Sequence, residues 1–214
     1  MDYDVARHIG AVAREVRACE RDGKPARAVI AGRRYDTGIE DAWDALTNGE
    51  RIPRWFLPIG GDLRLGGRYQ IEGNAGGTII ECEPPRRLAL SWEFAGTISW
   101  VTVTLDEEAQ ASTRLVLEHV ALIDPQFEGF WGQFGPGATG IGWDLSLLGL
   151  ASYLEDGAGK PPEGDLVWLA SENGKAFVGA SSEAWRAAAI AFGTDPGQAK
   201  EAADRTVQAY TAGG

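Results

Sequence analysis

The residues that decide the fold read RLALSWEF (Arg87–Phe94), ISWVTVTL (Ile98–Leu105) and TRLVLEHV (Thr113–Val120). Apolar and polar residues alternate along them, as expected for strands whose successive side chains point to opposite faces. The connections between them, Ala95-Gly96 and Asp106–Ser112, are short. Short connections join antiparallel neighbours, so we expect a meander with one dry face and one wet face.

Upstream residues extend this meander. Arg68–Glu72 and Thr78–Glu83 also read as strands, and Ala28–Tyr35 reads as a further strand. Between them, Ile39–Leu46 predicts a short helix. Residues 5–20 stay ambiguous, because their apolar spacing fits a helix while the Arg21–Lys24 turn signal fits a strand hairpin.

Downstream of the meander, a helix is expected from about Ala138 to Leu154. Its apolar surface is broad, and such a surface requires burial along much of its length. The dry face of the sheet is the natural partner. Strands followed by a terminal helix that covers one face define an α+β domain.

The rest of the chain predicts two more helices. Ser171 can cap one that Gly193 ends, and Asp195-Pro196 opens another that runs to about Tyr210. We therefore divide the sequence into an N-terminal segment (1–27), a main domain (28–157) and a helical C-terminal extension (158–214). The extension looks too small to hold its own core and is expected to pack on the main domain.

Charge and composition exclude several classes of protein. The 214 residues carry a net charge of −11, which disfavours binding to nucleic acid or to an anionic membrane. Cys19 and Cys82 lie far apart and form no metal-type spacing with either histidine, so reduced thiols in a cytoplasmic protein are expected. No apolar run is long enough to span a membrane, and we expect neither a cofactor nor a metal site.

An ordered series of short segments carries a family resemblance over roughly residues 28–155. The segments are Asp44–Thr47, Arg54–Phe56, Gly61–Arg64, Gly66–Tyr69, Gly76–Thr78, Cys82–Leu88, Ser91–Glu93, Thr113–Leu115 and Gly142-Trp143. This series resembles the SRPBCC (START-like) superfamily, within it the branch named after the activator of the heat-shock-protein-90 ATPase and polyketide cyclase-like proteins. The C-terminal part is similar to an extension of bacterial members.

The resemblance implies a helix-grip fold, in which a curved antiparallel sheet wraps around the long C-terminal helix and encloses a cavity. It also implies binding of a small hydrophobic or aromatic molecule in that cavity. Two alternatives remain open: a cyclase- or dehydratase-type enzyme that uses His119, and a co-chaperone-like protein-interaction domain. The apolar helix faces of the extension are compatible with a homodimer.

His119 is the candidate catalytic residue. It follows Leu115 and Leu117 on one face of its strand and should point toward the cavity, where an imidazole could exchange a proton. The alternative is an inward histidine with a satisfied hydrogen bond. Aromatic side chains are expected to line the cavity with it. The full set of candidate ligand-binding residues is Trp55, Phe56, Tyr69, Trp92, Trp100, His119, Trp131 and Trp143.

Other candidates favour ordinary explanations. Glu118 should face away from His119, and Asp144 is expected at the start of the long helix, where a carboxylate stabilises the dipole. His8 is expected in solvent. Gly135–Gly140 matches GxGxxG but lacks the βαβ context of a dinucleotide site, so a flexible entry to the helix is the better interpretation.

Overall fold

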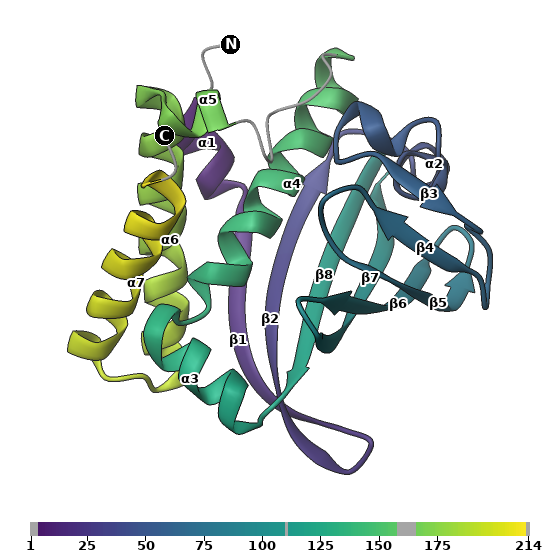
Figure 1. Cartoon of the computed structure of the whole chain (residues 1–214). Coiled ribbons are helices and arrows are strands. Elements are labelled where there is room, and N and C mark those ends of the chain that lie inside the picture. The colour runs from purple at the N-terminus through teal and green to yellow at the C-terminus, as the bar shows by residue number, and fades with distance from the viewer. Residues whose placement is uncertain (1–3, 110, 158–165, 213–214) are drawn as a thin grey trace. The chain divides into compact units, whose positions relative to one another are not determined.

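The computed structural model describes residues 4–109, 111–157 and 166–212 (Figure 1). Its strands are β1 (Val12–Arg21), β2 (Lys24–Tyr35), β3 (Ile59–Gly61), β4 (Arg68–Ile71), β5 (Gly76–Glu83), β6 (Arg87–Phe94), β7 (Thr97–Ala109) and β8 (Ser112–Leu122). Its helices are α1 (Val5–Gly10), α2 (Ile39–Thr47), the 3-10 turn η1 (Ile52–Arg54), α3 (Pro125–Phe134), α4 (Gly137–Asp156), α5 (Leu166–Ala170), α6 (Glu172–Phe192) and α7 (Pro196–Thr211).

The strands form one eight-stranded sheet with the order β1-β2-β8-β7-β6-β5-β4-β3. Consecutive strands from β3 to β8 pair in antiparallel fashion and form the meander. The other neighbour of β8 is β2, from the beginning of the chain. Two tight hairpins turn through residues with positive φ, namely Asp22-Gly23 and Ala95-Gly96. Both dipeptides fit the two-residue turns that match the right-handed twist of hairpin strands.

This architecture confirms the predicted fold class. The α+β fold with an antiparallel sheet and long C-terminal helices is that of the helix-grip proteins. Strands β4–β8 and the long helix were predicted to within a few residues, although β7 extends to Ala109 into the expected connection, and β3 was not predicted. The ambiguous N-terminal segment contains both alternatives, a short α1 followed by β1. Between β8 and the long helix the structure contains a helix that the sequence did not predict, α3.

The described residues divide into two compact units. Unit 1 comprises Met1–Ala31, Leu122–Leu145 and Pro162–Gly214, and unit 2 comprises Gly32–Ala121 and Ser146–Pro161. Strand β2 and helix α4 pass from one unit into the other. These two units are made of non-consecutive segments and therefore differ from the three consecutive segments 1–27, 28–157 and 158–214 expected from the sequence. Those three segments remain a prediction.

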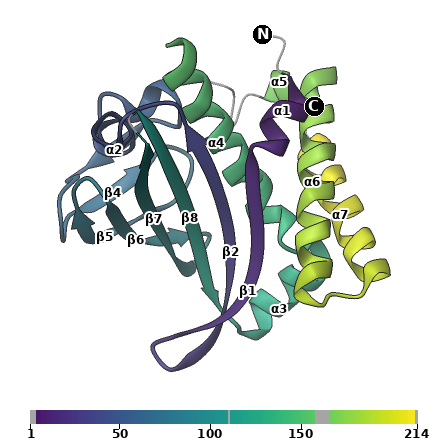
Figure 2. The same ribbon diagram turned by 180° about the vertical axis from the view of Figure 1, so that it is seen from behind.

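Unit 1 is built around α6. Helix α6 packs against β1 and lies side by side with α7, as both views show (Figures 1 and 2). Ser171 and Asp195 cap α6 and α7 with their side chains, as the sequence predicted. The core-facing side of α6 carries Phe177, Val178 and Trp185, which are almost fully buried.

Unit 2 contains the meander β3–β8, the end of β2, α2, η1 and the second half of α4. The Tyr35 hydroxyl at the end of β2 donates to the Leu147 carbonyl of α4 (3.2 Å). Thr37 lies just before α2, and its carbonyl accepts a hydrogen bond from the Thr113 hydroxyl of β8 (2.8 Å). In the described residues, no helix combines the length and apolar character that a membrane crossing requires.

Candidate functional site

The buried face of the unit 2 sheet brings an aromatic ring and an imidazole together. In the register of β6, β7 and β8, Trp92 lies opposite Ser99, and Val101 lies opposite His119. Directly opposed residues of an antiparallel pair share a face, and residues two apart on a strand share it too. Trp92, Ser99, Val101 and His119 therefore lie on one face of three neighbouring strands.

Burial varies along this face, and Val103 is partly exposed although Val101 is 3% exposed. Near α2, Leu105 and Leu115 are each 1% exposed. Toward the opposite end, Trp92 and His119 are partly exposed, and Phe94 is 50% exposed. We call the residues Trp92, Phe94, Ser99 and His119 the open end of the buried face.

His119 is held by a hydrogen bond within this open end. Its Nε2 lies 2.7 Å from the Ser99 hydroxyl, which in turn donates to the Trp92 carbonyl (3.3 Å). With the Ser99 proton directed to that carbonyl, the Ser99 oxygen accepts from Nε2–H. The Trp92 ring lies 6.0 Å from the imidazole, centroid to centroid. Loss of hydration lowers the pKa of His119 to about 4, so the ring is neutral at pH 7.

Three other predicted residues are packed in the core of unit 2. Tyr69 donates its hydroxyl proton to the Ser91 carbonyl (2.7 Å), and burial raises the pKa of this hydroxyl. Trp55 donates from Nε1 to the Ala45 carbonyl (2.9 Å), and its ring lies 5.5 Å from that of Phe56. All three side chains are less than 10% exposed. The polar atoms of Tyr69 and Trp55 thus bind backbone carbonyls inside the protein.

Trp100 is not brought together with His119. It lies opposite Val120 and Ser91, on the other face of the sheet from Trp92 and Ser99. Phe94, in contrast, shares the face of Trp92 and was not among the predicted residues. The alternation of Leu90, Trp92 and Phe94 in the segment that decided the fold was the signal that could have identified it.

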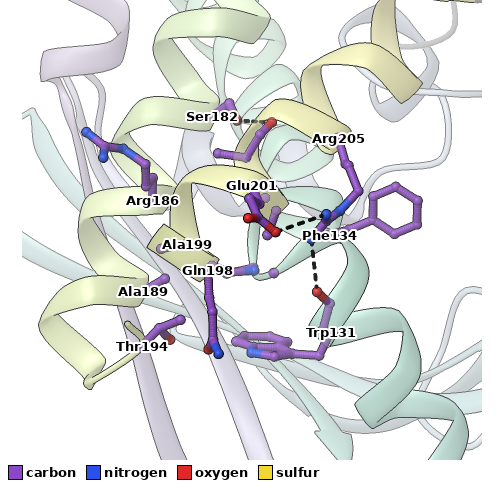
Figure 3. Close-up of a pocket in the computed structure, with 16 residues that line it drawn as sticks. Trp131, Phe134, Ser182, Arg186, Ala189, Thr194, Gln198, Ala199, Glu201 and Arg205 are labelled. Atoms are coloured by element: carbon purple, nitrogen blue, oxygen red, sulfur yellow. Dashed lines mark hydrogen bonds and ion pairs between the residues drawn. The ribbon is translucent and has the colours of Figure 1, made fainter. Parts of the chain in front are cut away.

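Trp131 and Trp143 belong to unit 1. Trp143 is buried in α4. Trp131 lines a cavity of about 330 Å³ whose walls come from α3, α6 and α7 (Figure 3). The structure therefore places one predicted aromatic residue in a cavity that the sequence did not predict.

Asp144 corrects a sequence-based interpretation. It lies in the second turn of α4, and its side chain is fully buried in unit 1 instead of stabilising an exposed helix end. Its Oδ2 accepts from Arg14 Nε (3.0 Å), Ser181 Oγ (2.5 Å) and Trp185 Nε1 (3.0 Å). Burial raises the pKa of Asp144, and these three partners oppose the shift. We call these four residues the Asp144 cluster.

His8 also differs from expectation. It was expected in solvent but is 7% exposed in α1. The segment Gly135–Gly140 was expected to be a flexible entry to the long helix. Gly137 and Gly140 instead belong to α4, and a side chain at Gly140 would meet the Trp185 ring.

The fold and the face just described define a START-like helix-grip domain. The family model for Activator of Hsp90 ATPase homolog 1-like protein matches residues 36–155. The chain belongs to this family. Among curated proteins, none is significantly similar to it.

Solved structures agree with this assignment. The crystal structure of CalU16 from Micromonospora echinospora is 32% identical, with a TM-score of 0.66 over 86% of this chain and 99% of CalU16. Its solution NMR structure gives 31% identity and a TM-score of 0.63, with 94% of each chain covered. DynU16, from the dynemicin biosynthetic locus, is 23% identical over 62% of this chain and 48% of its own, with a TM-score of 0.53, and shares the fold.

Proposed function

We propose that the protein binds a small hydrophobic or aromatic molecule at the open end of the buried face. The observation that supports this proposal is the accessible surface that Trp92 and Phe94 retain on the same face of the sheet as His119. A closed core would bury Trp92 and Phe94 as completely as Leu105 and Leu115, whereas they retain accessible surface. Ligand sites are lined mainly by apolar and aromatic side chains, with a few polar groups that fix the orientation of the ligand.

Each residue of the open end has a defined role in this proposal. Trp92 and Phe94 supply apolar area and flat rings against which an aromatic molecule can pack. His119 and Ser99 form the polar contact that orients it. Because the imidazole is already deprotonated at pH 7 and its pKa is about 4, it is a weak base, which favours a hydrogen-bonding role over general-base catalysis.

Native mass spectrometry of the purified protein tests the proposal without a chosen ligand. A co-purified hydrophobic molecule is the expected result. In parallel, calorimetric titration with 8-anilinonaphthalene-1-sulfonate measures binding of a defined aromatic probe to the wild-type chain and to variants. Absence of both a co-purified molecule and saturable probe binding would contradict the proposal.

Two tryptophans on opposite faces of the same strand pair provide the matched comparison. Trp92→Leu should weaken probe binding at least tenfold, because it removes a ring from the open end. Trp100→Leu removes an equal ring from the opposite face and should change the dissociation constant less than twofold. Equal effects of the two substitutions would place the probe elsewhere.

A further inference from the structure

The cavity of unit 1 has features of a second binding site. It lies between α3, α6 and α7, and its volume of about 330 Å³ is at the lower limit of typical ligand pockets. The space exists because small residues face it. The backbone of Gly135 and the side chains of Ala189, Ala199 and Ala202 leave room that larger residues would fill.

The Trp131 ring, which lines the cavity, is held in place by two residues that do not line it. The Trp131 ring stacks on Phe127 at 5.4 Å, and the Arg27 guanidinium carbon lies 4.6 Å from its centroid. Neither Phe127 nor Arg27 lines the cavity. A ring fixed in this way is a preformed surface for stacking, since little side-chain freedom remains to be lost when a ligand packs against it.

The walls of the cavity are also fixed by polar contacts. Arg205 Nε on α7 donates to the Gln133 carbonyl at the end of α3 (2.7 Å), and Thr206 donates to the Phe134 carbonyl (2.8 Å). These bonds satisfy carbonyls that a helix end leaves unpaired. Figure 3 shows Arg205 above Trp131, with the Gln198 side chain beside the indole ring.

Polar side chains near Trp131 indicate which hydrogen-bonding groups a ligand of the cavity would carry. The side chains of Thr194 and Gln198 line the cavity and have no hydrogen-bond partner within the described residues. Both can donate and accept. The two arginines of the lining are already neutralised, Arg205 by Glu201 (3.6 Å) and Arg186 by Glu183. The cavity thus offers hydrogen bonds but no uncompensated charge.

We propose that this cavity binds an uncharged planar aromatic molecule that carries a hydroxyl or carbonyl group. The ring stacks on Trp131, and the oxygen substituent bonds with Gln198 and Thr194. This site is independent of the open end of the buried face, and either can exist without the other.

The test uses 2-naphthol as the probe and the full-length chain. In ¹⁵N–¹H spectra, the indole signals of Trp131 and Trp92 are assigned from their Leu variants, so that the two sites are followed separately. Saturable shifts of the Trp131 signal are expected. Shifts confined to Trp92 would overturn this inference and leave the proposed function standing.

Matched variants test the two contacts. Trp131→Leu should weaken binding about tenfold, whereas Phe130→Leu, an exposed aromatic residue of the same helix outside the cavity, should change it less than twofold. Gln198→Ala should weaken binding about fivefold, against less than twofold for Lys200→Ala on the same helix. Gln198 and Lys200 are exposed, so these variants keep the fold even if Trp131→Leu does not.

The charge of the ligand is tested with 2-naphthoate. The free carboxylate should bind more weakly than 2-naphthol, because the lining arginines are paired. Tighter binding of 2-naphthoate would overturn the assignment to an uncharged molecule, and equal effects of Trp131→Leu and Phe130→Leu would overturn the site itself.

Discussion

At the scale of single residues, His119 is a polar side chain on the otherwise mainly apolar face formed by β6, β7 and β8. Its imidazole shares a hydrogen bond with Ser99 and faces the Trp92 ring. Loss of hydration makes its charged form unfavourable in the folded protein. A neutral imidazole of this kind can orient a ligand by hydrogen bonding at physiological pH.

The pKa of His119 gives a pH dependence of stability. The unfolded chain takes up this proton near pH 6.5, and the folded chain only near pH 4. Between these values the unfolded state binds more protons, so the free energy of unfolding falls as the pH falls, by up to about 3 kcal/mol from this group. Urea unfolding between pH 4 and 7 measures it.

His119→Gln serves as the matched variant for this measurement. Its amide can still bond with Ser99 but does not titrate, so the fall in unfolding free energy below pH 6.5 should be smaller by the contribution of His119. An unchanged profile in the variant would show that another group causes the pH dependence.

The Asp144 cluster is the second feature at this scale. Arg14 and Asp144 are both buried, and within the described residues Arg14 Nη2 and Asp144 Oδ1 have no hydrogen-bond partner. A buried ion pair of this kind contributes little net stability while intact, but losing one partner strands the other charge.

Asp144→Asn should therefore lower the free energy of unfolding by about 3–5 kcal/mol, because Arg14 is left charged and unpaired in the interior. The double variant Arg14→Met/Asp144→Leu removes both charges and should be more stable than Asp144→Asn alone. Urea unfolding of the variants at pH 7 measures both effects, and a cost below about 1 kcal/mol for Asp144→Asn would refute the interpretation.

At the scale of elements, close packing of α4 on α6 depends on a glycine. A Cβ at Gly140 would lie 2.2 Å from Cε2 of the Trp185 ring, which is fully buried. The ring cannot move aside without breaking its bond to Asp144. Gly140 is thus required for contact between the helices, at the expense of helix propensity.

Two glycine substitutions separate packing from propensity. Gly140→Ala should destabilise the protein by about 1–3 kcal/mol through overpacking against Trp185. Gly179→Ala, in α6 where a Cβ meets nothing within 4 Å, should stabilise it by about 0.5–1 kcal/mol. Thermal unfolding followed by circular dichroism measures both, and stabilisation by Gly140→Ala would contradict the packing argument.

At the scale of the whole molecule, the C-terminal helices complete a core that begins near the N-terminus. Unit 1 joins β1, the first half of α4 and α6 from three distant parts of the chain. The fully buried Trp185 and Phe177 come from α6, and Asp144 comes from α4. The extension is therefore part of a shared core.

A chain that ends after residue 157 should fail to unfold cooperatively, since it lacks Ser181 and Trp185, which donate to Asp144, and leaves the apolar residues of β1 uncovered. A chain that ends after residue 211 serves as the control and should unfold like the full-length protein. Thermal circular dichroism distinguishes them. Cooperative unfolding of the shorter chain would show that residues 1–157 fold without the C-terminal extension.

The sequence alone determined the fold class and the elements with a clear periodicity, but not helix α3 or the division of residues 5–20 into α1 and β1. Strand alternation and helical spacing depend on local side-chain patterns, so the meander around Trp92 and the long helix were predictable. The inward direction of His119 also followed from alternation with Leu115 and Leu117, and the structure places it on their face.

Only the tertiary structure decided which distant residues meet. The opposite faces of Trp92 and Trp100 depend on strand register, and the association of Asp144 with Arg14 and Trp185 depends on how three segments pack. The cavity beside Trp131 is lined by alanines of α6 and α7, which the fold brings together from separate helices. Periodicity tells which side of an element is apolar, whereas the identity of the partner depends on contacts between residues far apart in the chain.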